Sequence, residues 1–153
     1  NPIAFVEFED LSGKFEIPLF NRDYQQYFSQ VIPGKVYFIF GTRSTFNGND
    51  DGILRVMPQA LIQFENLARE LKGELKVTLS LEQIKKGLLA EIGAWQQRKP
   101  GKFKLQTQVQ TSDLNTYLLE SRRTFFPDNG ILSWLEKHNV DFSVKVITND
   151  KNS

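Results

Sequence analysis

The stretch from Ala4 to Phe20 reads AFVEFEDLSGKFEIPLF. Its second half alternates, with Phe15, Ile17 and Leu19 on one face and charged residues or proline on the other, which is the pattern of a half-buried β-strand. Its first half also favours a strand. Between the two, Asp10-Leu-Ser-Gly13 has turn chemistry, because the aspartate accepts backbone hydrogen bonds and glycine tolerates positive φ. The stretch therefore predicts an antiparallel hairpin.

A short helix is predicted after this hairpin. Asn21 is placed to cap it, Asp23 suits its first turn, and Pro33-Gly34 stops it. Its apolar residues have the i, i+3, i+4 and i+7 spacing of one helix face; they are Tyr24, Tyr27, Phe28 and Val31.

A second hairpin is predicted beyond the helix, with strands over 35–42 and 53–57 and an end at Pro58. Residues 63–72 carry apolar side chains at helical spacing and predict a connecting helix, after which Gly73 is a suitable C-terminal cap.

The second half of the chain has its own order of elements. Ser80, with Gln83 three residues later, forms a capping box that starts one helix, and Asp128 can cap another. Strands are expected on either side of these helices, over 74–79, 102–110, 115–121 and 140–146. The order β-α-β-β-α-β is the split βαβ arrangement of ferredoxin-like domains.

The sequence therefore predicts an α+β fold with two domains. A β-rich domain occupies residues 1–62, and a connecting helix lies within 63–73. An α+β domain follows over 74–147, and the polar residues 148–153 form a frayed tail.

Composition limits the classes of function. The 153 residues are 40% hydrophobic and carry a net charge of +1, which suits globular domains. Neither half is the strongly basic body that grips duplex DNA by its phosphates alone, so any nucleic-acid role is expected to be local or to depend on a larger protein. Residues 1–73 hold seven Lys and Arg against nine Asp and Glu, and the remainder hold twelve against nine. Cysteine is absent, which excludes disulfides and thiolate metal sites and favours a reducing, cytoplasmic compartment. No apolar run reaches the length of a membrane span.

Catalytic signatures are missing. His138 is the only histidine, so neither a histidine-based metal site nor a nucleophile-base pair has its partners. The acidic pair Asp50-Asp51 lies in the run NGNDDG at 47–52, which lacks the ligand spacing of a calcium loop and is typical of a hairpin tip. We expect no catalytic residue, no metal ligand and no cofactor in this chain.

Nucleic-acid binding is the candidate activity of the first half. Cations beside an aromatic side chain suit single-stranded nucleic acid, where phosphates pair and bases stack; the candidate residues are Lys14, Lys35, Arg43, Phe46 and Arg55. The alternative is a solvated sheet face, because Glu7, Glu9 and Glu16 occupy outward positions of the first hairpin. In the second half, the basic clusters at 98–104 and 122–123 fit either phosphate contacts or solvated loops.

Residues 8–20, the aromatic helix at 24–28 and Gly34-Lys35-Val36 together resemble the OB-fold segment near the C-terminus of the alpha subunit of bacterial DNA polymerase III, the replicative polymerase. The helix at 63–72 and the following α+β unit are similar in architecture to the domain after that OB fold.

The resemblance implies several functions. The OB domain is expected to meet single-stranded template DNA, and the terminal domain to contact the tau subunit of the clamp loader and other holoenzyme subunits. The parent protein would be a DNA-directed DNA polymerase that uses Mg²⁺. Its catalytic carboxylates lie upstream in the family, so no catalytic role is carried over to any residue here.

The family pattern also places one strand and a basic loop before the residues matching Ile3 to Phe8. Without that strand the OB barrel would be incomplete, and its unpaired sheet edge would favour dimerisation. Two other functions stay open. One is a freestanding OB-fold protein that binds tRNA or single-stranded DNA, and the other is a scaffold that binds only proteins.

Overall fold

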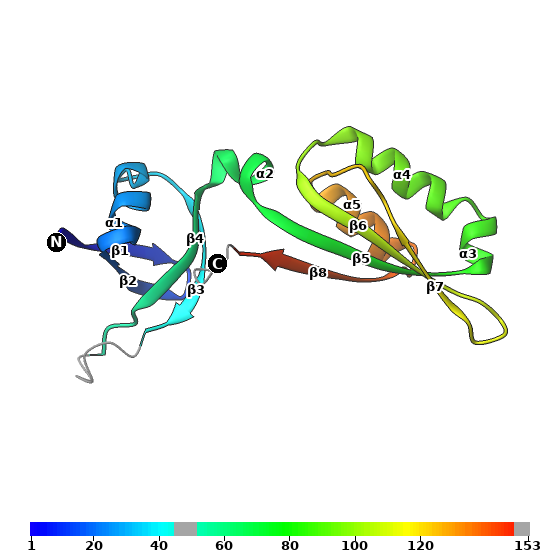
Figure 1. The fold of residues 1–153 in the computed structure, drawn as a ribbon, viewed down its shortest axis with the longest axis horizontal. Helices are drawn as coiled ribbons and strands as arrows, with labels where there is room; N and C mark the ends of the chain where they lie inside the picture. The colour runs from blue at the N-terminus through cyan, green and yellow to red at the C-terminus, as the bar shows by residue number, and fades with distance from the viewer. Residues whose placement is uncertain (45–51, 149–153) are drawn as a thin grey trace. The chain divides into compact units, whose positions relative to one another are not determined.

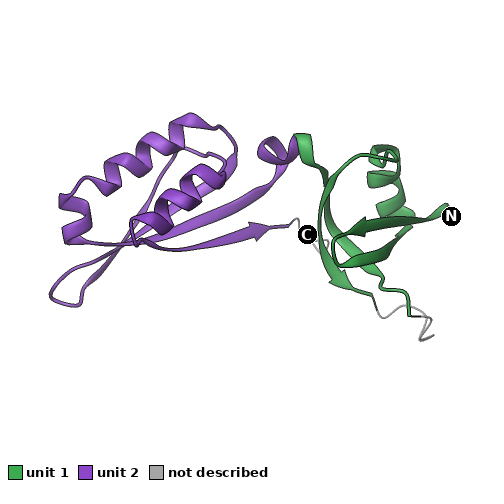
Figure 2. Cartoon of the chain, turned by 180° about the vertical axis from the view of Figure 1, so that it is seen from behind, with its two compact units in different colours: residues 1–65, 149–153 green, residues 66–148 purple. Residues whose placement is uncertain are grey.

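A computed structural model of the chain describes residues 1–44 and 52–148. These residues form a mixed α/β structure with several small sheets, divided into two compact units (Figures 1 and 2). Unit 1 comprises the described residues up to Glu65, and unit 2 comprises residues 66–148. The predicted polar tip at 47–52 and the tail at 148–153 lie almost wholly outside the described residues.

The first hairpin is confirmed. Strand β1 (Ile3–Asp10) pairs antiparallel with β2 (Gly13–Phe20) along its whole length. In the turn, the Asp10 carboxylate accepts hydrogen bonds from the Ser12 hydroxyl at 2.6 Å and the Ser12 N–H at 2.8 Å. These bonds favour the ionised carboxylate and hold the pKa of Asp10 below its ordinary value. Gly13 has a φ of 142°. The turn therefore depends on both the aspartate and the glycine, as predicted.

The core of unit 1 forms where this hairpin meets the next helix. Ile17 and Leu19 are fully buried, and Tyr27 and Leu61 complete the buried cluster. Tyr27 comes from helix α1 (Asn21–Tyr27), which continues as the 3₁₀ turn η1 (Phe28–Gln30). The apolar face predicted for β2 therefore packs against the aromatic helix α1, as expected.

The cap of α1 differs from the prediction. Phe20 is the N-cap residue, and no side chain caps the helix. Asn21 instead has a φ of 44°, a left-handed conformation that asparagine tolerates better than most residues. Because β2 leads directly into α1, this residue turns the chain from strand to helix and cannot act as the extended cap.

The second hairpin pairs β3 (Tyr37–Arg43) with β4 (Val56–Gln63). The predicted end at Pro58 is wrong, because β4 runs through this proline to Gln63. The pairing shifts register between Phe40 and Gly41, so that Phe40 faces Ala60 while Gly41 faces Pro58. A bulge tolerates a residue that has no N–H to donate to the ladder, and this explains how a proline fits inside the strand.

Gly41 is needed at this bulge. A Cβ there would lie 2.3 Å from the Met57 carbonyl oxygen and 2.8 Å from Val56 Cγ1. We expect Gly41→Ala to lower the free energy of unfolding of unit 1 by about 1–3 kcal/mol, as overpacking does. Urea unfolding followed by circular dichroism measures this loss.

The matched control is Gly93→Ala, inside helix α4 (Leu88–Arg98), where a Cβ would meet nothing within 4 Å. Alanine is a better helix former than glycine, so this variant is expected to stabilise unit 2 by about 0.5–1 kcal/mol. Equal stability of the wild type and Gly41→Ala would contradict the close approach at the bulge.

The two hairpins of unit 1 do not close into a barrel within the described residues. The Glu16 N–H donates to the Leu54 carbonyl at 2.8 Å, and Glu16 forms one isolated parallel bridge with Arg55. No longer ladder joins the hairpins in the described part of the chain, so two separate two-stranded sheets result. The barrel expected from the sequence is therefore not present in the described residues.

The predicted connecting helix over 63–72 is shorter than expected and is divided into two helical turns. β4 extends to Gln63, and only the 3₁₀ turn η2 (Phe64–Asn66) and the short helix α2 (Leu67–Glu70) follow before β5 begins at Lys72. Residues at both ends of the segment pair with neighbouring strands, so the helix does not extend to them. Gly73 is part of β5 and not a helix cap, since a Cβ there would lie 2.3 Å from the Phe103 ring.

Unit 2 is built on one four-stranded sheet in the order β7-β6-β5-β8. The strands are β5 (Lys72–Ser80), β6 (Lys102–Gln110), β7 (Thr116–Glu120) and β8 (Asp141–Ile147). β5 pairs parallel with β6, whereas β7 and β8 pair antiparallel at the edges. The predicted order of elements is present, but no strand separates β5 from β6. The split βαβ pairing of ferredoxin-like domains is therefore corrected to an unsplit βαβ unit with added edge strands.

Helices cover one face of this sheet (Figure 1). They are α3 (Leu81–Lys85), α4 and α5 (Asn129–Lys137). Ser80 and Gln83 form the predicted capping box of α3, and the Asp128 carboxylate accepts from the backbone N–H groups of Gly130 and Ile131 at the start of α5. The helix predicted after Ser80 is interrupted at Gly87, which has a φ of 86°.

Candidate nucleic-acid interface

Two of the predicted cations lie beside each other in unit 1. Arg43 ends β3 and faces Val56, and the Ser44 N–H donates to the Arg55 carbonyl at 2.8 Å. The Arg55 side chain, however, is 15% exposed and forms an ion pair with Glu16, Nε to Oε1 at 3.0 Å. Glu16 faces Glu7 across the first hairpin, so the arginine offsets a like-charge pair. Arg55, which directly precedes β4, thus ties this segment to β2, whereas the Arg43 side chain is exposed.

Lys14 lies at the start of β2. It faces Glu9 across the hairpin and forms an exposed ion pair with Glu7 at 3.6 Å. Exposed pairs of this kind contribute little to stability and exchange readily with solvent ions. Lys14 therefore remains accessible to an anion, although glutamates surround it.

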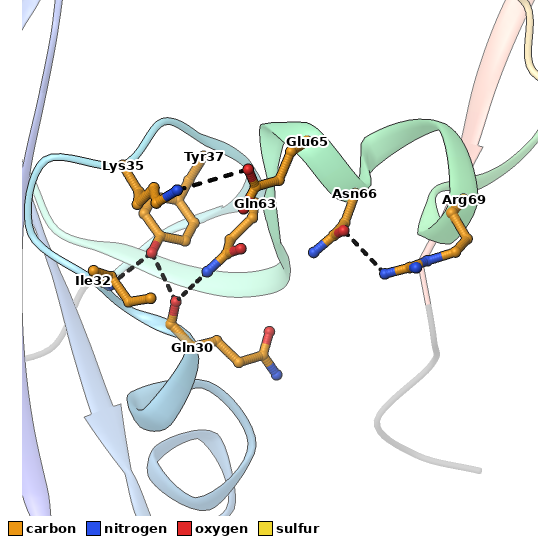
Figure 3. A network of polar contacts seen from close by, with 8 residues as sticks. All are labelled: Gln30, Ile32, Lys35, Tyr37, Gln63, Glu65, Asn66 and Arg69. Atoms are coloured by element: carbon orange, nitrogen blue, oxygen red, sulfur yellow. Dashed lines mark hydrogen bonds and ion pairs between the residues drawn. The ribbon is translucent and has the colours of Figure 1, made fainter.

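Lys35 lies before β3, at the end of that strand away from Arg43. It forms an exposed ion pair with Glu65 at 3.7 Å (Figure 3). The neighbouring Tyr37 hydroxyl donates to the Gln30 carbonyl and accepts from the Ile32 N–H, both at 2.7 Å, and the Gln63 amide also donates to Gln30. These contacts fix the chain between α1 and β3. Lys35 belongs to that network and does not join the other cations.

The structure thus places Lys14, Arg43 and Arg55 at one end of the hairpins and Lys35 at the other. Phe46 lies outside the described residues. Of the four candidate cations, only Arg43 combines an exposed side chain with no ion pair to another described residue. The predicted five-residue surface is therefore not assembled as one site by the residues that the structure describes.

The basic clusters of unit 2 are partly held by aromatic rings. The Arg98 guanidinium lies 4.1 Å from the centre of the Trp95 ring, and the Lys99 ammonium lies 5.4 Å from that of Phe126. Such cation–π contacts fix the direction of each side chain. Arg122 and Arg123 are exposed.

One edge strand of unit 2 is apolar and exposed, which its sequence did not indicate. All five residues of β7 are exposed, including Tyr117, Leu118 and Leu119 at 55%, 56% and 48%. The strand pairs with β6 along one side only. An exposed, apolar sheet edge is a ready template for a further strand.

His138 lies in unit 2 at the end of α5. Its ring is 4.4 Å from that of Trp134, and its Nδ1 is 2.9 Å from the Trp134 carbonyl oxygen. It borders a hollow of about 560 Å³ whose lining includes Ser80, Gln83 and Lys86. Within residues 1–44 and 52–148, no group of three acidic or histidine side chains is placed to hold a metal ion. Over the same residues, no helix has the length and apolar character needed to cross a membrane.

The chain matches no model of a known protein family and no curated protein.

Proposed function

We propose that this chain is the C-terminal region of a bacterial replicative DNA polymerase of the polymerase III alpha type. In this proposal, unit 1 is part of an OB-type module for single-stranded template DNA. Unit 2 holds the polymerase in its holoenzyme through the tau subunit of the clamp loader. The parent protein would be a cytoplasmic DNA-directed DNA polymerase that supplies the Mg²⁺-dependent chemistry elsewhere in its chain.

The arrangement of unit 1 supports this proposal most. A hairpin, a short helix with a buried tyrosine and a second hairpin follow each other, and Glu16 of β2 contacts Leu54 and Arg55, directly before β4. This is the order that the resemblance implies for part of an OB barrel, in which successive hairpins share one core. The sequence resemblance over 8–36 lies in the elements that form this core.

Arg43 is the residue through which unit 1 would meet DNA. It is exposed at the end of β3, and Lys14 lies on the strand next to Arg55. A cation in this position pairs with backbone phosphates, and each contact contributes to a salt-dependent affinity.

The test is the variant Arg43→Glu in the whole chain, titrated into a labelled oligothymidylate and followed by fluorescence anisotropy. We expect the affinity to fall about three- to tenfold at low salt and the salt slope to become shallower by about one phosphate contact. Arg22→Glu, an equally exposed arginine on α1, makes the same change in net charge and is expected to alter the affinity less than about twofold. An unchanged affinity of Arg43→Glu would remove unit 1 from the DNA contact.

The edge strand β7 supports the holoenzyme part of the proposal. An extended segment of a partner can add to such an edge by main-chain hydrogen bonds, with Tyr117 and Leu119 on one face and Leu118 on the other giving selectivity. A freestanding scaffold would use the same edge, so tau binding by purified components separates the two functions. Dimerisation through the sheet edge that the missing first OB strand would leave in unit 1, which light scattering would detect, remains a prediction of this proposal.

A further inference from the structure

The second face of the unit 2 sheet is the one that helices do not cover. Alternate residues of β5 and β6 point into the core, among them Leu75, Val77 and Leu105, which are at most 4% exposed. The residues between them point to the opposite face, because successive side chains of a strand alternate. In the views of Figures 1 and 2, all helices of unit 2 lie to one side of its strands.

Five lysines meet on this open face. Lys72 faces Lys102 across the parallel pair β5 and β6, and Lys76 lies two pairs further along β5. Glu74 lies between them and faces Lys104 on β6 and Lys145 on β8. Neighbouring strands are about 4.8 Å apart, and alternate residues of a strand are about 6.6 Å apart, so these charges lie within one patch.

The patch has a net positive charge. On the open face of this sheet, five lysines and three acidic residues, Glu74, Glu120 and Asp141, leave a net charge of +2. Neither Glu74 nor any of the five lysines forms an ion pair with another described residue. Further along the same face, Asp141 lies opposite Thr78 and Glu120 lies opposite Gln106, so the five lysines and Glu74 form the basic end of the sheet. We name this group, Lys72, Lys76, Lys102, Lys104 and Lys145 with Glu74, the lysine face.

We infer that the lysine face binds the phosphate backbone of a nucleic acid. Lysine ammonium groups bind phosphates as point charges, and several on one flat surface contact consecutive phosphates. No aromatic residue occupies the open face of β5, β6, β7 or β8 in the described pairing, so bases have no ring to stack on. The binding is therefore expected to depend on salt but not on base sequence, and to accept duplex as well as single strands.

This inference does not rest on the proposed function, since it follows from the charge and register of unit 2 alone. The resemblance assigns protein contacts to this unit, and the lysine face adds a contact with DNA or RNA. Because unit 1 is proposed to meet single strands, a duplex probe reports on the lysine face separately.

The test uses the whole chain with the double substitution Lys76→Glu and Lys104→Glu, titrated into a labelled duplex and a labelled oligothymidylate. The duplex affinity is expected to fall at least about tenfold at about 50 mM salt, and the salt slope to become shallower by about one unit for each lysine. The control is Lys85→Glu with Lys137→Glu, exposed lysines on α3 and α5, which changes the net charge equally on the helical side. It is expected to alter the duplex affinity less than about twofold.

Two results would overturn the inference. One is an equal loss of affinity in both double variants, which would mean that only net charge matters. The other is competition by polyglutamate as effective as that by DNA at equal charge, which would assign the face to an acidic protein. Lys76→Gln with Lys104→Gln keeps the side-chain length without introducing repulsion. This glutamine variant is expected to weaken duplex binding, as the glutamate variant does, and to leave the unfolding transition unchanged.

Discussion

Replacing Phe125 with alanine is expected to lower the free energy of unfolding of unit 2 by about 3–5 kcal/mol, the usual cost of emptying a large buried aromatic site. Phe125 is 1% exposed and lies beside Phe103, which is 2% exposed. The backbones of the two residues exchange hydrogen bonds, with N–H to O distances of 2.8 and 3.0 Å. Their side chains thus enter the core at a place where the backbone is fixed, and the surrounding structure cannot collapse to fill the space.

Tryptophan fluorescence during urea unfolding measures this effect selectively, because both tryptophans, Trp95 and Trp134, belong to unit 2. The control is Leu118→Ala on β7, where the leucine is 56% exposed and its truncation is expected to cost less than about 0.5 kcal/mol. If Phe125→Ala unfolds at the same urea concentration as the wild type, the assignment of Phe125 to the core is wrong.

Leu19→Ala is expected to destabilise unit 1 by about 2–5 kcal/mol. Leu19 is 0% exposed and belongs to the cluster of Ile17, Tyr27 and Leu61, which joins β2, α1 and β4. Each unit has its own buried cluster, so the tryptophan transition of unit 2 is expected to stay unchanged while the circular dichroism signal of unit 1 is lost earlier.

Leu11 offers the matched control for this substitution. It is a leucine of the same hairpin, fully exposed at the turn, and Leu11→Ala is expected to leave both transitions within about 0.5 kcal/mol of the wild type. A Leu19→Ala protein in which both transitions shift together would show that the units unfold as one.

The hairpin turn and the helix starts could be predicted from the sequence, because each depends on residues that are close together in the chain. The first hairpin follows from the alternation around Ile17 and from the Asp10 turn, and the starts of two helices follow from Ser80 and Asp128. Pairing between distant strands carries no such signal. The periodicity at 102–110 predicts a strand, but nothing in it says that β6 lies directly beside β5.

The same reason explains the errors. The helical spacing of 63–72 is real, yet β4 and β5 pair with other strands and leave only short helical turns between them. The partner of Arg55 is Glu16, 39 positions earlier, so sequence alone could not show that this candidate cation is engaged. The lysine face likewise depends on three strands whose order the sequence did not reveal.

We propose that this chain binds nucleic acid by its phosphates as part of a larger replication protein. The most direct measurement is the anisotropy of a labelled oligothymidylate titrated with the wild-type chain between about 50 and 200 mM salt. We predict measurable binding at the lowest salt, with the logarithm of the affinity falling linearly with the logarithm of the salt concentration. An anisotropy that stays flat at the lowest salt would show that the chain does not bind nucleic acid by its phosphates.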